Sequence, residues 1–198
     1  MNKALTIKDI AEIAGVAKST VSRYLNNGKV SEETKEKIRQ VIEEYNYENF
    51  NAYSAQVEIT GKSIHPGNAK DKMVSAINVA IEFENMLPAQ QKAYFTDGYD
   101  GFNHLHHLEG SCEKATLEYI IRNHDLTLAK KQINDFKRIK KYLDEKYGYE
   151  LIKLDIKESY LNMAEVIKEN YYIIERLEKA MNSVGIQGFA SPIRGGTD

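Results

Sequence analysis

The sequence has a single cysteine, no tryptophan and no long apolar run. The one cysteine, Cys112, excludes an intrachain disulfide and favours a reducing, cytoplasmic compartment. No apolar stretch approaches the roughly 20 residues needed to span a bilayer, so we expect no membrane partner. The N-terminus lacks an apolar core followed by a small-residue cleavage site, and therefore no signal peptide is expected.

An excess of positive charge is also missing. Lys and Arg number 27 against 29 Asp and Glu, which gives a formal net charge of −2 at pH 7. The chain as a whole is therefore not a polybasic nucleic-acid binder, and any contact with DNA must depend on the local placement of charge. Near Tyr47 the pattern changes from short, capped helices to alternating strands and longer amphipathic helices.

The first part predicts three short helices. The first begins at Thr6, with Asp9 placed to complete a capping box. A tight turn at Gly15-Val16 precedes a second helix over residues 18–26, which is expected to end at Asn27-Gly28. Ser31 caps a third helix, whose predicted buried stripe consists of Ile38, Val41, Ile42 and Tyr45. Two short helices joined by a tight turn and braced by a third give a helix-turn-helix pattern.

The second helix carries the side chains suited to DNA. It exposes together Lys18, Ser19, Thr20, Ser22, Arg23 and Asn26. Such groups reach base edges and phosphates.

These residues resemble the head of the lac repressor family. The similarity is carried by the run Thr6-Ile7-Lys8-Asp9-Ile10-Ala11, by residues 19–26 (STVSRYLN) and by residues 30–38 (VSEETKEKI). The resemblance implies that Lys18, Ser19 and Arg23 face the major groove of double-stranded DNA. It also implies phosphate contacts from Thr6, Ser22, Asn26, Ser31 and Thr34. Ala17 stands where that family usually has a capping serine, and this departure is expected to weaken the start of the second helix by about 1 kcal/mol. The family's hinge helix and sugar-binding core do not follow the head.

The second part predicts alternating strands and helices. Ala55, Val57 and Ile59 mark a first strand, and residues 102–108 and 117–121 two more, joined at Glu109-Gly110-Ser111. A fourth strand is marked by Ile152, Leu154 and Ile156. A first helix is expected to bury Met73, Ile77, Ala80, Ile81 and Glu84. A second helix, ending at Gly148, is expected to bury Ile133, Phe136, Ile139 and Leu143.

The predicted fold class follows from this order. It is α+β: an all-α helix-turn-helix head, then a ferredoxin-like βαββαβ sandwich and a C-terminal helix. The last helix should run from about Ala164 to Val184 and bury Ile174, Leu177, Met181 and Val184. The predicted domains are residues 1–47, 48–162 and 163–198.

Residues 48–198 resemble peptidase T, a family of tripeptide aminopeptidases with two zinc ions. The similarity is carried by segments 61–67 (GKSIHPG), 98–102 (GYDGF), 113–117 (EKATL), 119–122 (YIIR), 162–165 (NMAE) and 192–198 (PIRGGTD). It implies the lid, or dimerisation, domain of that family and the first segment returning to its catalytic domain. The family's zinc ligands and catalytic glutamate lie outside this stretch, so no catalytic residue, metal or cofactor is expected.

Several residues invite a functional interpretation that the sequence does not favour. His65 matches a lid histidine and Arg194 a substrate-contacting arginine of that family, and without a catalytic domain both are expected to be vestigial, His65 having a turn role. Alternation places His104 and His106 on one face of a strand. No further ligand stands at zinc spacing, so a solvated pair is favoured over a metal site there. Cys112 has no histidine placed against it and is not expected to be a nucleophile.

Two functions remain open, and so does an artificial origin of the chain. The first is a transcriptional regulator, in which the lid domain pairs two DNA-binding heads as a homodimer. The alternative is a truncated or chimeric fragment of a zinc tripeptide aminopeptidase without activity of its own. The fusion could also be artificial.

Overall fold

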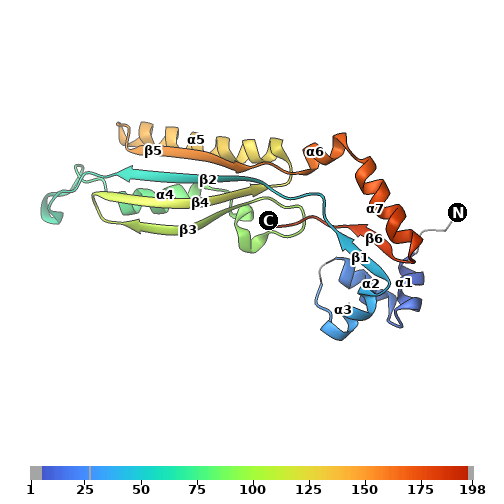
Figure 1. The fold of residues 1–198 in the computed structure, drawn as a ribbon. Coiled ribbons are helices and arrows are strands. Elements are labelled where there is room, and N and C mark those ends of the chain that lie inside the picture. The colour runs from blue at the N-terminus through green and yellow to red at the C-terminus, as the bar shows by residue number, and fades with distance from the viewer. Residues whose placement is uncertain (1–5, 27, 196–198) are drawn as a thin grey trace. The chain divides into compact units, whose positions relative to one another are not determined.

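The computed structural model describes residues 6–26 and 28–195, and its contacts divide the chain into two compact units. Unit 1 combines residues 1–48 with 163–193, and unit 2 combines residues 49–162 with 194–198. The chain therefore passes from unit 1 into unit 2 and back again (Figure 1). No described helix is both long enough and apolar enough to cross a membrane.

Unit 2 is a four-stranded antiparallel sheet with two α-helices. Its elements are β2 (Asn51–Thr60), α4 (Ala76–Met86), β3 (Phe102–Gly110), β4 (Lys114–Asn123), α5 (Leu126–Tyr147) and β5 (Ile152–Tyr160). Short 3-10 turns, η1 (Pro66–Asn68), η2 (Ala89–Gln91) and η3 (Ala93–Phe95), lie in the connections. The strand order is β3-β4-β2-β5, so β3 and β5 are the edges (Figure 1). This confirms the α+β class, while the finer ferredoxin-like assignment stays a prediction.

The core of unit 2 lies between the sheet and the helices. Period-two alternation in β2 buries Ala55, Val57 and Ile59, as the sequence predicts. The rings of Phe83 from α4, Tyr119 from β4 and Phe136 from α5 pack on one another with centroids 5.0–6.3 Å apart. The end of α5 is also as expected, because Gly148 takes the left-handed conformation, with φ of 78°, that a helix C-terminus favours.

The sequence assigns the wrong face to α4. The helix starts at Ala76, after Met73, and buries Ala76, Val79, Ala80 and Phe83. Ile77 and Ile81, which were expected in the core, are 39% and 52% exposed. Apolar residues occur on more than one side of this helix, so periodicity alone did not identify the side that faces the sheet.

Unit 1 contains the three predicted head helices and a small parallel sheet. Its elements are α1 (Ile7–Ile13), α2 (Lys18–Leu25), α3 (Glu32–Arg39), β1 (Ile42–Tyr45), α6 (Ala164–Glu169), α7 (Tyr172–Ser183) and β6 (Gln187–Ala190), and β1 pairs with β6. Thr6 and Asp9 form the predicted capping box, and the Ser31 hydroxyl accepts from the Thr34 N–H. Ala17 makes no side-chain cap, and Gly15 provides the turn with φ of 65°.

The predicted extent of the third helix is wrong. The third helix ends at Arg39, and Ile42–Tyr45 is a strand rather than the end of that helix. These residues form a strand because β6, from far along the chain, pairs with them in parallel. The side chain of Tyr45 lies outside the described residues, as does Asn27.

The predicted last helix is two helices. α6 ends before Asn170 and α7 begins at Tyr172. Ile174 and Met181 are buried as expected, whereas Leu177 and Val184 are 39% and 71% exposed. The predicted stripe thus holds for the two residues spaced i and i+7, which lie on one face of the helix. It fails for the two residues on the neighbouring flank.

Candidate functional site

The residues predicted to touch DNA lie in the head, and several of them already serve its local structure. The Thr6 hydroxyl and the Ser31 hydroxyl cap helices, and Thr34 lies 2.8 Å from Ser31 between the two hydroxyl oxygens. The Asn26 amide donates to the Ser22 carbonyl at 2.7 Å. Exposed side chains at the start and middle of α2 are Lys18, Ser19 and Arg23, and Thr20 and Ser22 are partly buried.

The head has a contact that the sequence did not reveal. Its buried core includes Val21, Ile38 and Ile42, and Phe189 from β6 packs against this core. The Phe189 ring meets the ring of Tyr24 on α2 edge-on, with centroids 6.4 Å apart. The head is thus packed on a strand that follows it by about 150 residues of chain, and it is not an independent bundle.

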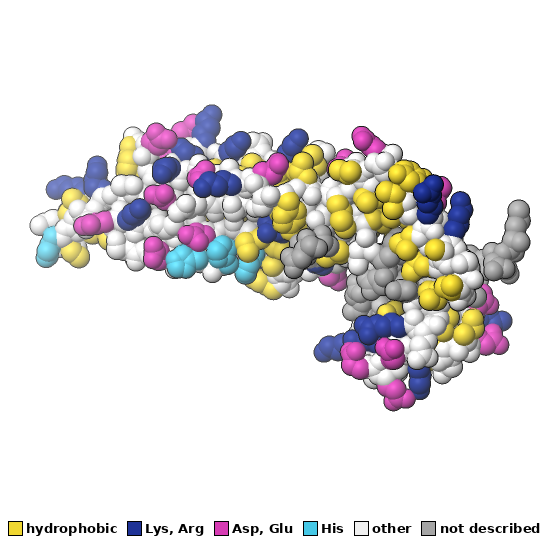
Figure 2. Space-filling model, viewed as in Figure 1, with side chains coloured by type: hydrophobic (Ala, Val, Ile, Leu, Met, Phe, Trp, Pro, Cys, Tyr) yellow, Lys and Arg dark blue, Asp and Glu magenta, His cyan; other side chains and the backbone are white. Residues whose placement is uncertain are grey.

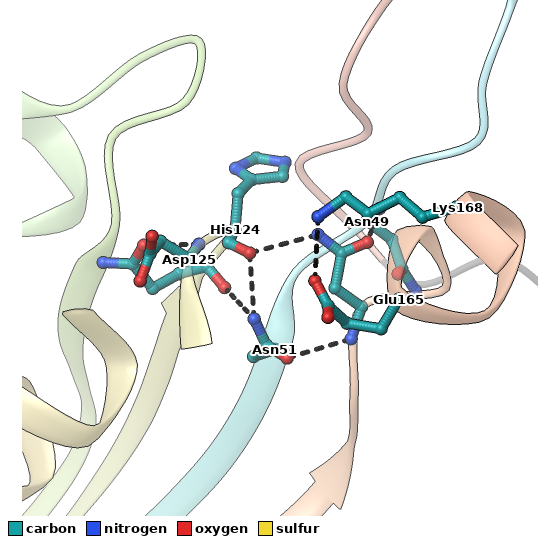
Figure 3. Close-up of polar contacts among 8 residues, drawn as sticks. Asn49, Asn51, His124, Asp125, Glu165 and Lys168 are labelled. Atoms are coloured by element: carbon teal, nitrogen blue, oxygen red, sulfur yellow. Dashed lines mark hydrogen bonds and ion pairs between the residues drawn. The ribbon is translucent and has the colours of Figure 1, made fainter. Parts of the chain in front are cut away.

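A buried amide network, the asparagine root, joins the points where the chain enters and leaves unit 2. The Asn51 side-chain amide donates to the carbonyls of Asn123 and His124 at 3.1 and 2.9 Å. Its oxygen accepts from the Asn162 N–H at 3.0 Å, and the Asn162 amide donates to the His124 carbonyl at 3.1 Å (Figure 3). Asn51 and Asn162 are 1% and 4% exposed, so these bonds form out of reach of bulk water.

A second chain of amides continues from the root across the sheet. Asn123 donates to Gln132 on α5, Gln132 donates to Asn103 on β3, and Asn103 donates to Gln91, each at 2.9 Å. The first three side chains are buried. Polar side chains at these positions form no periodic pattern in the sequence, so neither network could be predicted from it.

Arg194 is held by unit 2 itself. Its guanidinium donates to the carbonyls of Gly98 and Asp100 and to the Thr96 hydroxyl at 2.8–2.9 Å. It also lies over the rings of Phe50 and Phe102, 5.4 and 5.6 Å from their centroids. These contacts anchor the residue structurally. Its vestigial substrate role stays a prediction.

His65 is exposed and occupies a turn. Its Nδ1 accepts from the Gly67 N–H at 3.2 Å and so caps η1. Over the described residues, no group of three His, Cys, Asp or Glu side chains is arranged to hold a metal ion.

The three histidines of β3 lie on an exposed edge strand. His104 pairs with Ile120 and His107 with Glu118 on β4, and a register shift between Leu105 and His107 leaves His106 in a bulge. Simple alternation therefore does not place His106. It lines a shallow depression on the helix-free face of the sheet with Ser54, Gln56 and Glu118. Figure 2 shows histidine side chains in a row along this side of unit 2.

The two flanks of α4 differ. On one flank, Glu82 binds Lys146 and Tyr147 of α5. On the other, Glu84 accepts from the Tyr119 hydroxyl and from Lys92. Burial, together with the Glu84 carboxylate, raises the pKa of the Tyr119 phenol, and the Glu84 carboxylate raises the pKa of Lys92.

Known families match both parts of the chain. The model for bacterial regulatory proteins of the lacI family matches residues 6–49, and the model for the peptidase dimerisation domain matches residues 47–149. Both resemblances seen in the sequence are therefore confirmed.

The curated relatives resemble the second part. Peptidase T of Clostridium perfringens is 46% identical over 157 residues, which cover 79% of this chain and 39% of the relative. Peptidase T of Geobacillus kaustophilus is 43% identical over 155 residues, covering 78% and 38%. The chain thus spans about 39% of the length of the first of these relatives.

Solved structures agree on the fold. Aminopeptidase PepT from Bacillus cereus superposes with a TM-score of 0.64 at 16% identity, covering 79% of this chain and 41% of that one. A tripeptidase from Staphylococcus aureus gives 0.64 at 16%, covering 78% and 40%.

These comparisons correct the functional interpretation. The expectation of a DNA-binding transcriptional regulator is wrong, because the curated relatives at 42–46% identity are peptidase T, and the lacI-family match is confined to residues 6–49. The alternative, a fragment of a tripeptide aminopeptidase, fits them better. DNA as a partner rests on the head match alone, and contacts from its residues stay a prediction.

Proposed function

Because the chain belongs to the peptidase dimerisation domain family, we propose that it is a non-catalytic segment of a peptidase T-type aminopeptidase, whose unit 2 joins two copies. The observation that carries this proposal is the 46% identity to peptidase T over 157 residues, which include all of unit 2 that the family model matches. In this assignment the head is an addition to the peptidase segment and does not determine what the chain does.

Two observations support the absence of catalysis. The matched stretch amounts to 39% of the relative, and the resemblance puts the family's zinc ligands and catalytic glutamate outside it. The described residues also offer no group of three ligating side chains. Hydrolysis assisted by two metal ions needs such groups around both ions.

The fold supports a role in assembly. A four-stranded sheet covered by helices on one face is large enough to fold around its own core, and its edges can pair with another strand. We further infer that the order β3-β4-β2-β5, with all neighbours antiparallel, is that of a ferredoxin-like sandwich.

The proposal is tested by assaying the pure chain for release of an N-terminal residue from tripeptides, with zinc added. We expect no turnover above buffer, while an intact peptidase T assayed beside it is active. Zinc-dependent turnover that follows the chain through successive purification steps would overturn the proposal. Light scattering on the same sample is expected to give the mass of two copies at neutral pH.

A further inference from the structure

Three oxygen atoms of unit 2 converge on the guanidinium of Arg194. Its Nη1 donates to the carbonyls of Gly98 and Asp100 at 2.9 and 2.8 Å, and its Nη2 donates to the Thr96 hydroxyl at 2.8 Å. All three acceptors are uncharged, and two belong to the main chain. They therefore recognise the cation by the number and direction of its N–H groups, which in arginine form a fixed, planar fork.

Two aromatic rings face the same guanidinium. Its carbon lies 5.4 Å from the ring centroid of Phe50 and 5.6 Å from that of Phe102. The two rings pack edge-on with centroids 5.5 Å apart, and the fully buried Phe50 also packs on the ring of His124 at 4.2 Å. A flat and weakly hydrated guanidinium binds to aromatic faces in a way that the compact, strongly hydrated ammonium of lysine does not.

The loop that supplies the acceptors is held by its own hydrogen bonds. The Thr96 hydroxyl donates its proton to the Ala93 carbonyl at 3.2 Å, which leaves its oxygen free to accept. The Asp100 N–H donates to the Asp97 carbonyl at 2.8 Å, and Gly98 inside this turn has a φ of 48°, which glycine adopts without strain. Because these bonds do not involve the guanidinium, the acceptors are arranged before a ligand binds, and ordering them costs little.

We propose that these acceptors and rings, the guanidinium cage, are a binding site for the side chain of arginine, and that Arg194 occupies this site from within the chain. The cage consists of Phe50, Thr96, Gly98, Asp100 and Phe102. Arg194 is half-buried and Asp100 is exposed, so the cage is open to solvent on one side. The ligand class is a planar guanidinium on a flexible stem, such as the arginine of a peptide. This assignment does not depend on the proposed function.

Arg194 competes with an external guanidinium because it is tethered beside the cage. The Ile193 N–H donates to the Glu48 carbonyl at 2.9 Å, which holds the main chain next to Arg194 near the segment that carries Phe50. The side chain of Arg194 can therefore leave the cage while its main chain stays in place. A group on a short tether has an effective concentration in the millimolar range. Free arginine groups displace it only at such concentrations, and removing the Arg194 side chain opens the cage to them.

The test is a nuclear magnetic resonance titration of the whole chain, labelled with nitrogen-15, with N-acetyl-arginine amide. The amide signals of Gly98 and Asp100 report on the cage. We expect Arg194→Ala to bind this probe with a dissociation constant of about 1–10 mM, and the parent to bind it about tenfold more weakly because its own side chain competes. N-acetyl-lysine amide has the same charge without the planar fork, and should bind to Arg194→Ala about tenfold more weakly than the arginine probe. Arg194→Lys should behave like Arg194→Ala, and is the second variant should the first fail to fold.

A matched pair of substitutions, each added to Arg194→Ala, tests the acceptors. Thr96→Val removes one acceptor at nearly constant volume and should weaken binding of the arginine probe about tenfold. Thr127→Val, at an exposed position of α5, should leave that binding unchanged. Circular dichroism verifies that each variant is folded. The inference is wrong if Gly98 and Asp100 do not shift, if the parent binds as tightly as Arg194→Ala, if the two probes bind equally, or if Thr96→Val binds like Thr127→Val.

Discussion

At the scale of single residues, the strongest constraints in unit 2 are buried amides. Asn51 makes three hydrogen bonds to the backbone of β4, the loop after it and the chain beyond β5. Removing its side chain would take one donor from each of two buried carbonyls and the acceptor from the Asn162 N–H, and a buried group left unsatisfied costs about 1–3 kcal/mol. The root therefore fixes how the entering and leaving segments meet, independently of any ligand.

We predict that Asn51→Ala lowers the free energy of unfolding of unit 2 by about 3 kcal/mol, as expected for a broken buried network. Urea unfolding followed by circular dichroism measures this. Asn134→Ala, at an exposed position of α5, is the control and should change stability by less than about 0.5 kcal/mol. Equal effects of the two substitutions would show that the root contributes nothing particular.

At the scale of helices and strands, the buried face can be predicted from the sequence where the apolar residues lie on one side of the element only. Strand β2 alternates strictly and has one buried face, so Ala55, Val57 and Ile59 were placed correctly. In α4 the apolar residues surround much of the helix, and Ile77 and Ile81 were assigned to the core although they lie on an exposed flank. The hydrophobic periodicity predicts that this segment is a helix. Which face of the helix is buried is decided by its packing against the sheet.

The strand β1 shows a different failure. Val41 and Ile42 continue the helical spacing of Ile38, and all three are buried. The partner that converts Ile42–Tyr45 into a strand is Gln187–Ala190, far along the chain. No local sequence pattern predicts such a pairing, and none predicts the packing of Phe189 on Tyr24. The buried amides were missed for a related reason, because their partners are set by the tertiary fold.

The start of α2 offers a test at this scale. Ala17 has the extended conformation of an N-cap, with ψ of 147°, but accepts no hydrogen bond. We predict that Ala17→Ser stabilises the head by about 1 kcal/mol, because its hydroxyl can accept from the first turn of the helix. Ala180→Ser, in the exposed interior of α7, should instead destabilise slightly. Thermal unfolding compares the two variants, and a head that Ala17→Ser leaves unchanged would contradict the prediction.

At the scale of the whole molecule, the two resemblances cover unequal parts of the chain and favour different functions. The lacI-family match covers residues 6–49, and a head of this kind favours a transcriptional regulator. The relatives instead match 79% of the chain and are peptidase T. The proposed function therefore follows the larger part, whose sequence resembles a lid domain.

In the proposed function, self-association depends on unit 2 alone. The most direct measurement compares sedimentation equilibrium of the segment 48–162 with that of the whole chain, both in the same buffer. We predict that the segment folds and dimerises with the dissociation constant of the whole chain, to within about threefold, because the head contributes nothing to the contact. A whole chain that dimerises while the folded segment stays monomeric would contradict it.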